Sequence, residues 1–201
     1  MSILDHFARL WTLPEWSTDK ASGTTAVRAK PPMTTIDRDH FARLWTFHQW
    51  ATDQAFDALA PVLAAELDRQ WGGSFGTGRA LLRHVVGIER LWCDRLNGQS
   101  PKALPEYPTD YGGHEFRDAW QQIRSDQRHV IDALTPRQLA SDLTYVNIKG
   151  ETWTYPLADV LFQCVNHGTY HRGQITQLLR DLGRNAPPTD FTIFLQAEKK
   201  R

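Results

Sequence analysis

The sequence contains little of what marks the specialised classes of protein. Only two of its 201 residues are cysteines, which is too few for a disulfide framework. No apolar run approaches the roughly 18 residues of a membrane span, and the N-terminus lacks the apolar core of a signal peptide. The 23 basic and 23 acidic side chains cancel, so no basic surplus points to nucleic acid or to an anionic membrane. We therefore expect a cytoplasmic protein that binds neither nucleic acid nor a membrane.

What is present is the composition of an ordinary globular domain. Apolar residues make up 41% and charged residues 23% of the chain, values that are typical of soluble globular proteins. A length of 201 residues corresponds to one domain, or to one domain with an appendage. Eight tryptophans are many, so we expect some of them to line a pocket or an interface as well as the core.

An identical eight-residue string, DHFARLWT, occurs at 5–12 and again at 39–46. Two copies are too few for a solenoid. The second copy continues into an amphipathic pattern, whereas the first is interrupted by Pro14 and followed by a loop-like stretch. We expect residues 1–34 to be a poorly ordered N-terminal extension that duplicates part of the first helix, and residues 35–201 to be the folded domain. The alternative is a genuine short N-terminal helix that docks on that domain.

Apolar residues at three- and four-residue steps predict a bundle of helices. The predicted long helices cover about residues 37–64, 77–97, 113–134 and 156–183. A proline-containing connection at 98–112 is long enough for a crossover, and β-prone segments on either side of Gly150 predict a small hairpin. The predicted fold is all-α: a four-helix bundle with a long crossover connection and a small β-hairpin before the last helix.

The last predicted helix carries two histidines, His167 and His171, on the stripe where a bundle helix normally has Leu or Ile. Residues four apart share one face of a helix, so both imidazoles can reach a single metal ion. His84 takes a core position on the second predicted helix, and helix bundles build metal centres from facing helices in this way. The alternative is a set of buried histidines that are bonded to other side chains or to water.

Several polar side chains near this stripe have two interpretations. His48 could be a fourth polar group of the centre, but we expect it to be partly exposed. Cys164, one turn before His167, could be a thiolate ligand, although a small buried apolar side chain is the favoured interpretation. Arg172 could clamp an anionic substrate, but we favour a pair with a carboxylate of the first helix.

Each ligand ring needs an acceptor for its other nitrogen, and the candidates by position are Glu89, Gln127 and Gln163.

Three strings of sequence carry a resemblance to a known family, namely QWAT at 49–52, LRHVVGIERLW at 82–92 and NHGTYHRGQ at 166–174. With these strings, residues 37–196 resemble the DinB/YfiT-like family of metalloenzymes. The resemblance implies a four-helix bundle with a long crossover, frequent homodimers, and a divalent metal held by His84, His167 and His171. Many members have a further histidine where this sequence has Gln163.

The resemblance also implies a chemistry, because relatives include thiol-S-transferases and isomerases that use low-molecular-weight thiols. Three neutral imidazoles leave zinc or nickel at least one open position, where a bound water or thiol loses its proton near neutral pH. We expect a metal-dependent enzyme with a small-molecule substrate, either a thiol-dependent transferase acting on small electrophiles or a hydrolase. One alternative is a non-catalytic metal-binding stress or interaction protein that acts as a dimer. Another is a metal-free bundle whose histidines are core polar groups.

Overall fold

The computed structural model describes residues 38–200, which form helices and one hairpin. The helices are α2 (Arg38–Leu59), α3 (Ala64–Leu67), α4 (Gly78–Leu96), α5 (Gly113–Ala133), α6 (Pro136–Leu139), α7 (Leu157–Asp181) and α8 (Phe191–Glu198). The hairpin consists of β1 (Asp142–Val146) and β2 (Thr152–Pro156). The expected N-terminal extension, with the first copy of the repeated string, lies outside the described residues.

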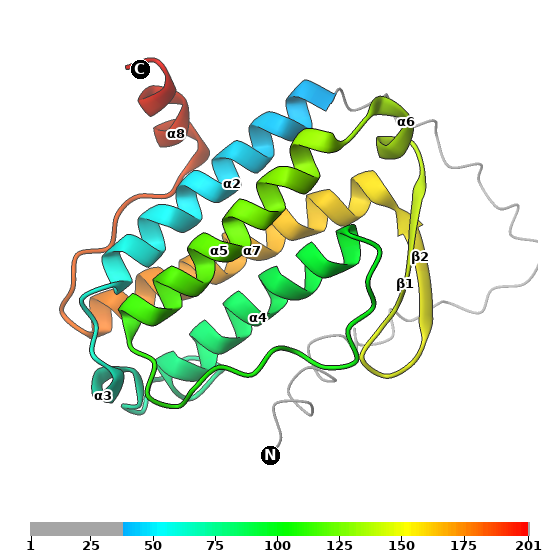
Figure 1. The fold of residues 1–201 in the computed structure, drawn as a ribbon. Coiled ribbons are helices and arrows are strands. Elements are labelled where there is room, and N and C mark those ends of the chain that lie inside the picture. Colours follow the sequence, from blue (N-terminus) through cyan, green and yellow to red (C-terminus); the bar gives the residue numbers. More distant parts are fainter. Residues whose placement is uncertain (1–37, 201) are drawn as a thin grey trace, which may run out of the picture. The chain divides into compact units, whose positions relative to one another are not determined.

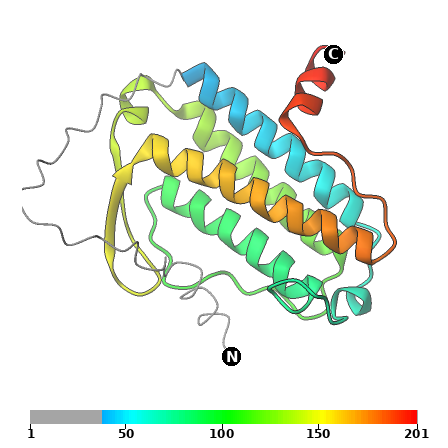
Figure 2. The ribbon, with the colours of Figure 1, turned by 180° about the vertical axis from the view of Figure 1, so that it is seen from behind.

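Four long helices, α2, α4, α5 and α7, pack side by side (Figures 1 and 2). Helix α2 packs against α5 and α7, and α4 packs against the same two helices, so α2 and α4 occupy diagonal positions. The segment between α4 and α5 runs back along the length of the bundle, which makes these two helices parallel neighbours (Figure 1). The predicted all-α fold, with its long crossover and its hairpin before the last bundle helix, is therefore confirmed.

The core fills the space between these helices with large apolar side chains. Trp120 of α5 stacks on Phe56 of α2 with 6.0 Å between the ring centroids, and both side chains are fully buried. Burying a side chain such as Phe56 contributes about 1.5–3 kcal/mol to folding. Gly113 lets α5 begin against the end of α2, because a Cβ at this position would lie 1.7 Å from the carbonyl oxygen of Leu59. A side chain at this position would therefore push the start of α5 away from the end of α2.

The hairpin packs on the C-terminal end of α4. The guanidinium of Arg95 lies over two neighbouring rings, 4.7 Å from the centroid of Trp92 and 4.1 Å from that of Tyr145 in β1. A cation over an aromatic face is attracted by the ring, so this contact joins the hairpin to the bundle. Gly150 has a φ of 85° in the hairpin turn, a left-handed conformation that favours glycine.

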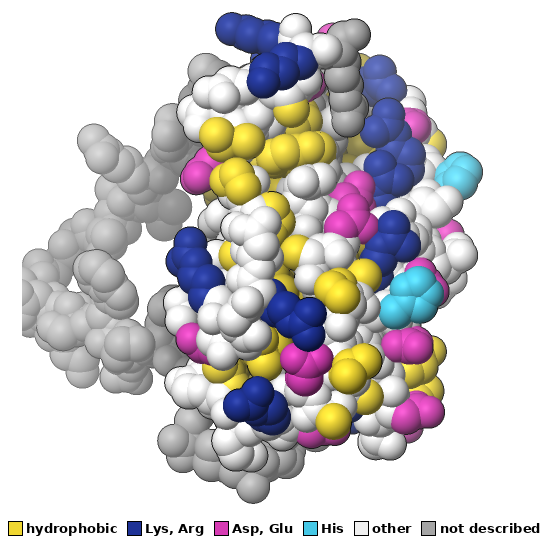
Figure 3. Space-filling view, turned by 90° about the vertical axis from the view of Figure 1, so that its left-hand side faces the viewer, with side chains coloured by type: hydrophobic (Ala, Val, Ile, Leu, Met, Phe, Trp, Pro, Cys, Tyr) yellow, Lys and Arg dark blue, Asp and Glu magenta, His cyan; other side chains and the backbone are white. Residues whose placement is uncertain are grey.

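The surface mixes charges of both signs. On the face shown in Figure 3, basic side chains are interspersed with acidic ones and with apolar patches, in keeping with the net charge of zero. Within residues 38–200, no helix has both the length and the apolar character needed to cross a bilayer.

Candidate metal centre

The three predicted histidines converge inside the bundle. His84 comes from α4, and His167 and His171 come from one face of α7. The ligand atoms that they offer all lie within 4.8 Å of one another. The Nε2 atoms of His84 and His171 are 3.0 Å apart, and so are those of His171 and His167. Three ring nitrogens of the same kind therefore point to one small volume.

This arrangement fits a divalent metal ion. Zinc–nitrogen bonds of about 2.0–2.1 Å in a tetrahedral site place the nitrogens roughly 3.3 Å apart, close to the separations seen here. The Nδ1 atom of His171 lies 2.6 Å from Oε1 of Gln174. An amide oxygen only accepts, so Nδ1 carries the proton and Nε2 keeps its lone pair for a metal.

The protonation of the cluster also suits a metal. Burial, together with the neighbouring His171, lowers the pKa of His167 from 6.5 to about 4. Burial likewise lowers the pKa of His171, although the bond to Gln174 acts in the opposite direction. Both rings are therefore neutral at pH 7, which is the state that binds a metal.

Aromatic rings form the wall of the cluster. The ring centroid of Phe75 lies 4.8 Å from that of His84 and 5.8 Å from that of His171, and Tyr170 stands 5.0 Å from His171. Phe75 belongs to the loop before α4, where Ser74 Oγ accepts a hydrogen bond of 3.3 Å from the Gln174 amide. The Gln174 side chain therefore joins this loop to His171.

The acceptor for His171 differs from our expectation. We expected Glu89, Gln127 or Gln163, but Gln174 fills this position, and Gln127 donates to Glu89 instead. The signal was present in the sequence, since a residue three positions after His171 lies on the same face of the helix. Cys164 is not a member of the three-histidine cluster. Its thiol is buried, and burial raises the pKa of Cys164 well above its usual value, in agreement with the favoured apolar role.

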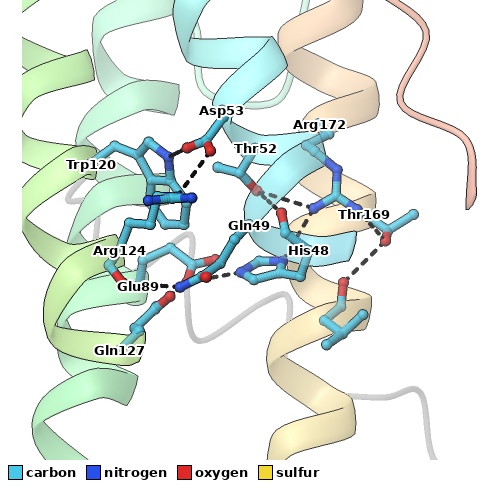
Figure 4. A network of polar contacts seen from close by, with 11 residues as sticks. His48, Gln49, Thr52, Asp53, Glu89, Trp120, Arg124, Gln127, Thr169 and Arg172 are labelled. Atoms are coloured by element: carbon cyan, nitrogen blue, oxygen red, sulfur yellow. Dashed lines mark hydrogen bonds and ion pairs between the residues drawn. The ribbon is translucent and has the colours of Figure 1, made fainter. Parts of the chain in front are cut away.

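A second polar cluster, which we call the central polar network, consists of Arg172, His48, Glu89 and Gln127 (Figure 4). Its four members come from α7, α2, α4 and α5, so every long helix of the bundle contributes one. Arg172 lies 3.2 Å from Nδ1 of His48, His48 Nε2 lies 3.3 Å from Glu89 Oε2, and Gln127 donates to Glu89 at 2.7 Å. All four side chains are buried.

Two sequence predictions fail at this network. His48 was expected to be partly exposed, yet its exposed fraction is 0%. Its ring packs so closely on α7 that a Cβ at Gly168 would lie 2.4 Å from its Cε1 atom. Arg172 was expected to pair with a carboxylate of the first helix, but it reaches His48 and the Thr52 hydroxyl of that helix instead. The prediction that Arg172 bridges helices is confirmed, and only its partner is wrong.

The donors and acceptors of the network fix its charges. A guanidinium can only donate, so Nδ1 of His48 accepts from Arg172, and Nε2 of His48 donates to Glu89. Burial acts to raise the pKa of Glu89, but His48, Gln127 and His167 outweigh it, and the pKa is lowered. Burial lowers the pKa of Arg172 to about 10, against the attraction of Glu89. The network thus joins the Arg172 cation to the Glu89 anion through His48, whose ring accepts a hydrogen bond on one side and donates one on the other.

Comparisons with known proteins bear on both the fold and the cluster. A sequence model of the DinB family matches residues 33–201. Protein DinB of Bacillus subtilis (strain 168) is 28% identical over 122 residues, which cover 57% of this chain and 70% of that protein.

Solved structures share the fold. A DinB-like protein from Bacillus cereus ATCC 10987 matches with a TM-score of 0.59 and 20% identity, over 75% of this chain and 95% of that chain. A DinB-like protein from Bacillus subtilis matches with a TM-score of 0.55 and 12% identity, over 74% of this chain and 95% of that chain. From the match over residues 33–201, the chain belongs to the DinB family.

Proposed function

We propose that this protein is a metal-dependent enzyme in which His84, His167 and His171 hold a zinc or nickel ion. The observation that carries the proposal is the convergence of three Nε2 atoms: that of His171 lies 3.0 Å from each of the other two, and at least two of the rings are neutral at pH 7. Structural zinc sites usually have four protein ligands, whereas catalytic sites have three and keep one position open. A bound ion would lower the pKa of a water or thiol in that position and supply a nucleophile at neutral pH.

The reaction class that we propose is transfer of a low-molecular-weight thiol to a small electrophile. The thiol loses its proton to solvent, and its sulfur forms a bond to an electrophilic carbon. The bond from that carbon to a leaving group breaks at the same time, and the leaving group departs with the electron pair. The Tyr170 ring, whose centroid stands 5.0 Å from that of His171, supports this class, because an apolar ring beside a metal suits a small organic substrate better than a polymer. The family resemblance to thiol-S-transferases supports it as well.

A second candidate is a non-catalytic metal-binding protein that acts as a homodimer. The observation that favours it is the Phe75 ring, which packs against two of the three histidines. A groove of about 90 Å³ lies elsewhere, beside Trp50, Arg128 and Phe194. The exposed rings of Phe162 and Tyr170 on α7, with exposed fractions of 58% and 56%, would suit a dimer surface in either candidate.

The test is the metal content of the purified, untagged protein, measured by mass spectrometry. We expect close to one equivalent of zinc or nickel. A His167→Ala, His171→Ala double variant should lose it, and a control with His114→Ala and His129→Ala, two exposed histidines of α5, should keep it. If the protein contains no metal and takes up none after dialysis against either ion, the proposal is wrong.

A second measurement separates the two candidates. The metal-loaded protein is incubated with a panel of small thiols and electrophiles, and the loss of free thiol is followed. Consumption that requires the bound metal supports the enzyme. No consumption by a protein that binds metal and forms a stable dimer supports the second candidate.

A further inference from the structure

Glu89 is a buried carboxylate that lies beside the three-histidine cluster without belonging to it. It follows His84 by five residues on α4, and its side chain is bonded to His48 and Gln127. Its carboxylate nevertheless interacts electrostatically with both His167 and His171. His48, its main partner, packs directly on Gly168, the residue that follows His167. The central polar network therefore lies against the turn of α7 that includes Gly168, between His167 and His171. Figure 4 shows His48 beside Thr169 and Arg172 of this helix.

A metal in this site would bring two positive charges into the interior of the bundle. Neutral imidazoles add no negative charge, and a buried charge is unfavourable unless an opposite charge compensates for it. Among residues 38–200, the cluster that could hold the ion consists of histidines and includes no carboxylate. Glu89 is the buried carboxylate that acts on the cluster, and it is connected to the Arg172 cation through the His48 ring.

We propose that Glu89 is a positioning residue that sets the affinity of the three-histidine centre for a divalent cation through its charge, and that Arg172 opposes it. The inference rests on the proposed function, because it requires a metal at His84, His167 and His171. It goes further in assigning opposite effects to two side chains of the same network. Glu89 attracts the ion without coordinating it, and the Arg172 cation repels the ion.

A purely structural role for the network makes a different prediction. If Glu89 and Arg172 only connected helices, then loss of either would loosen α4 and α7 and weaken metal binding in both cases. If their charges act on the ion, the two substitutions change the affinity for the metal in opposite directions. The substitutions Glu89→Gln and Arg172→Gln are suited to this test, because each removes one charge while the new amide keeps a hydrogen-bonding group for His48.

The experiment measures the affinity for Zn²⁺ by competition with a chromophoric chelator at pH 7. It compares the wild-type chain, Glu89→Gln, Arg172→Gln and the double variant, with folding checked by circular dichroism. The control is Asp53→Asn, which removes a half-buried carboxylate that is bonded to Trp120. We expect Glu89→Gln to weaken Zn²⁺ binding by about 10- to 100-fold, as do changes around other metal ligands. Arg172→Gln should tighten binding, the double variant should lie between the two, and Asp53→Asn should match the wild type.

Two results would overturn the inference while leaving the proposed function intact. In the first, the wild-type chain binds Zn²⁺ and Glu89→Gln binds it with an affinity within twofold of the wild type. In the second, Arg172→Gln weakens Zn²⁺ binding as much as Glu89→Gln does. A wild-type chain that takes up no Zn²⁺ would overturn both. If Glu89→Gln alone does not fold, the comparison of the double variant with Arg172→Gln decides, because the variant that retains Glu89 should bind more tightly.

Discussion

The bundle holds two buried polar clusters that differ in how their polar atoms are paired: the three-histidine cluster comes from α4 and α7, and the central polar network comes from all four long helices. The central polar network alternates donors with acceptors, from Arg172 through His48 to Glu89, and balances one cation with one anion. The three-histidine cluster instead brings three Nε2 atoms together, with that of His171 3.0 Å from each of the other two. Within residues 38–200, Arg172 Nε and Gln127 Oε1 of the network have no hydrogen-bond partner, but its bonds between Arg172, His48, Glu89 and Gln127 join all four helices and stabilise the fold. Converging lone pairs, in contrast, gain most from a cation. The same core thus has one polar region whose groups pair with one another and one that could hold a metal ion.

We expect the largest effect on the stability of the protein from a substitution in the central polar network. Arg172→Met leaves Glu89 buried without its cation, so we expect the free energy of unfolding to fall by about 3–5 kcal/mol. Urea denaturation of the metal-free protein measures this. The matched control is Arg128→Met, which breaks an exposed ion pair with Asp132 and should change stability by less than about 0.5 kcal/mol. A loss below about 1 kcal/mol for Arg172→Met would contradict the comparison.

A somewhat smaller loss of stability should appear when the pH of the metal-free protein is lowered, because of His167 in the three-histidine cluster. The unfolded chain takes up a proton at His167 as pH falls through 6.5, whereas the folded chain takes it up only near a pKa of about 4. Protons therefore favour the unfolded state between these values. We expect about 3 kcal/mol of stability to be present above pH 6.5 and to be lost progressively as pH falls to about 4.

Denaturation at a series of pH values, in the presence of a chelator, checks this prediction. His167→Ala should flatten the dependence on pH in that window, and His114→Ala, an exposed histidine of α5, should leave it unchanged. An equally steep dependence in His167→Ala would assign the acid sensitivity to another group.

The smallest effect concerns the link between the histidine cluster and its surroundings. Gln174→Leu removes the acceptor for Nδ1 of His171, so we expect metal affinity to fall by about 10- to 100-fold, equivalent to roughly 1.4–2.7 kcal/mol. Chelator competition measures the change. Gln177→Leu is the control, because Gln177 lies on the exposed side of the same helix and bonds to Asp181 rather than to a histidine. Equal affinities of the two variants would mean that Gln174 does not orient His171.

Helical periodicity accounts for how much could be predicted from the sequence. The spacing of apolar residues located all four bundle helices to within a few residues, because one face of each helix must be buried. The prediction for the first helix ran past Leu59 through the turn into α3, where the apolar pattern continues although the helix ends. The spacing of His167 and His171, with His84 on a core stripe, was enough to predict the cluster.

Only the tertiary structure decided which residues of the neighbouring helices contact each buried helix face. Periodicity assigns a side chain to a face but does not say which residue of another helix lies opposite, and that choice depends on helix order and on close approaches such as Gly168 against His48. The burial of His48 and the partner of Arg172 follow from such contacts, so they could not be predicted from spacing. The helices and the three histidines could be predicted from the spacing of residues along the sequence, because the buried face of a helix repeats at a fixed spacing. The neighbouring polar residues form a separate, charge-balanced network only because four helices pack in this particular order.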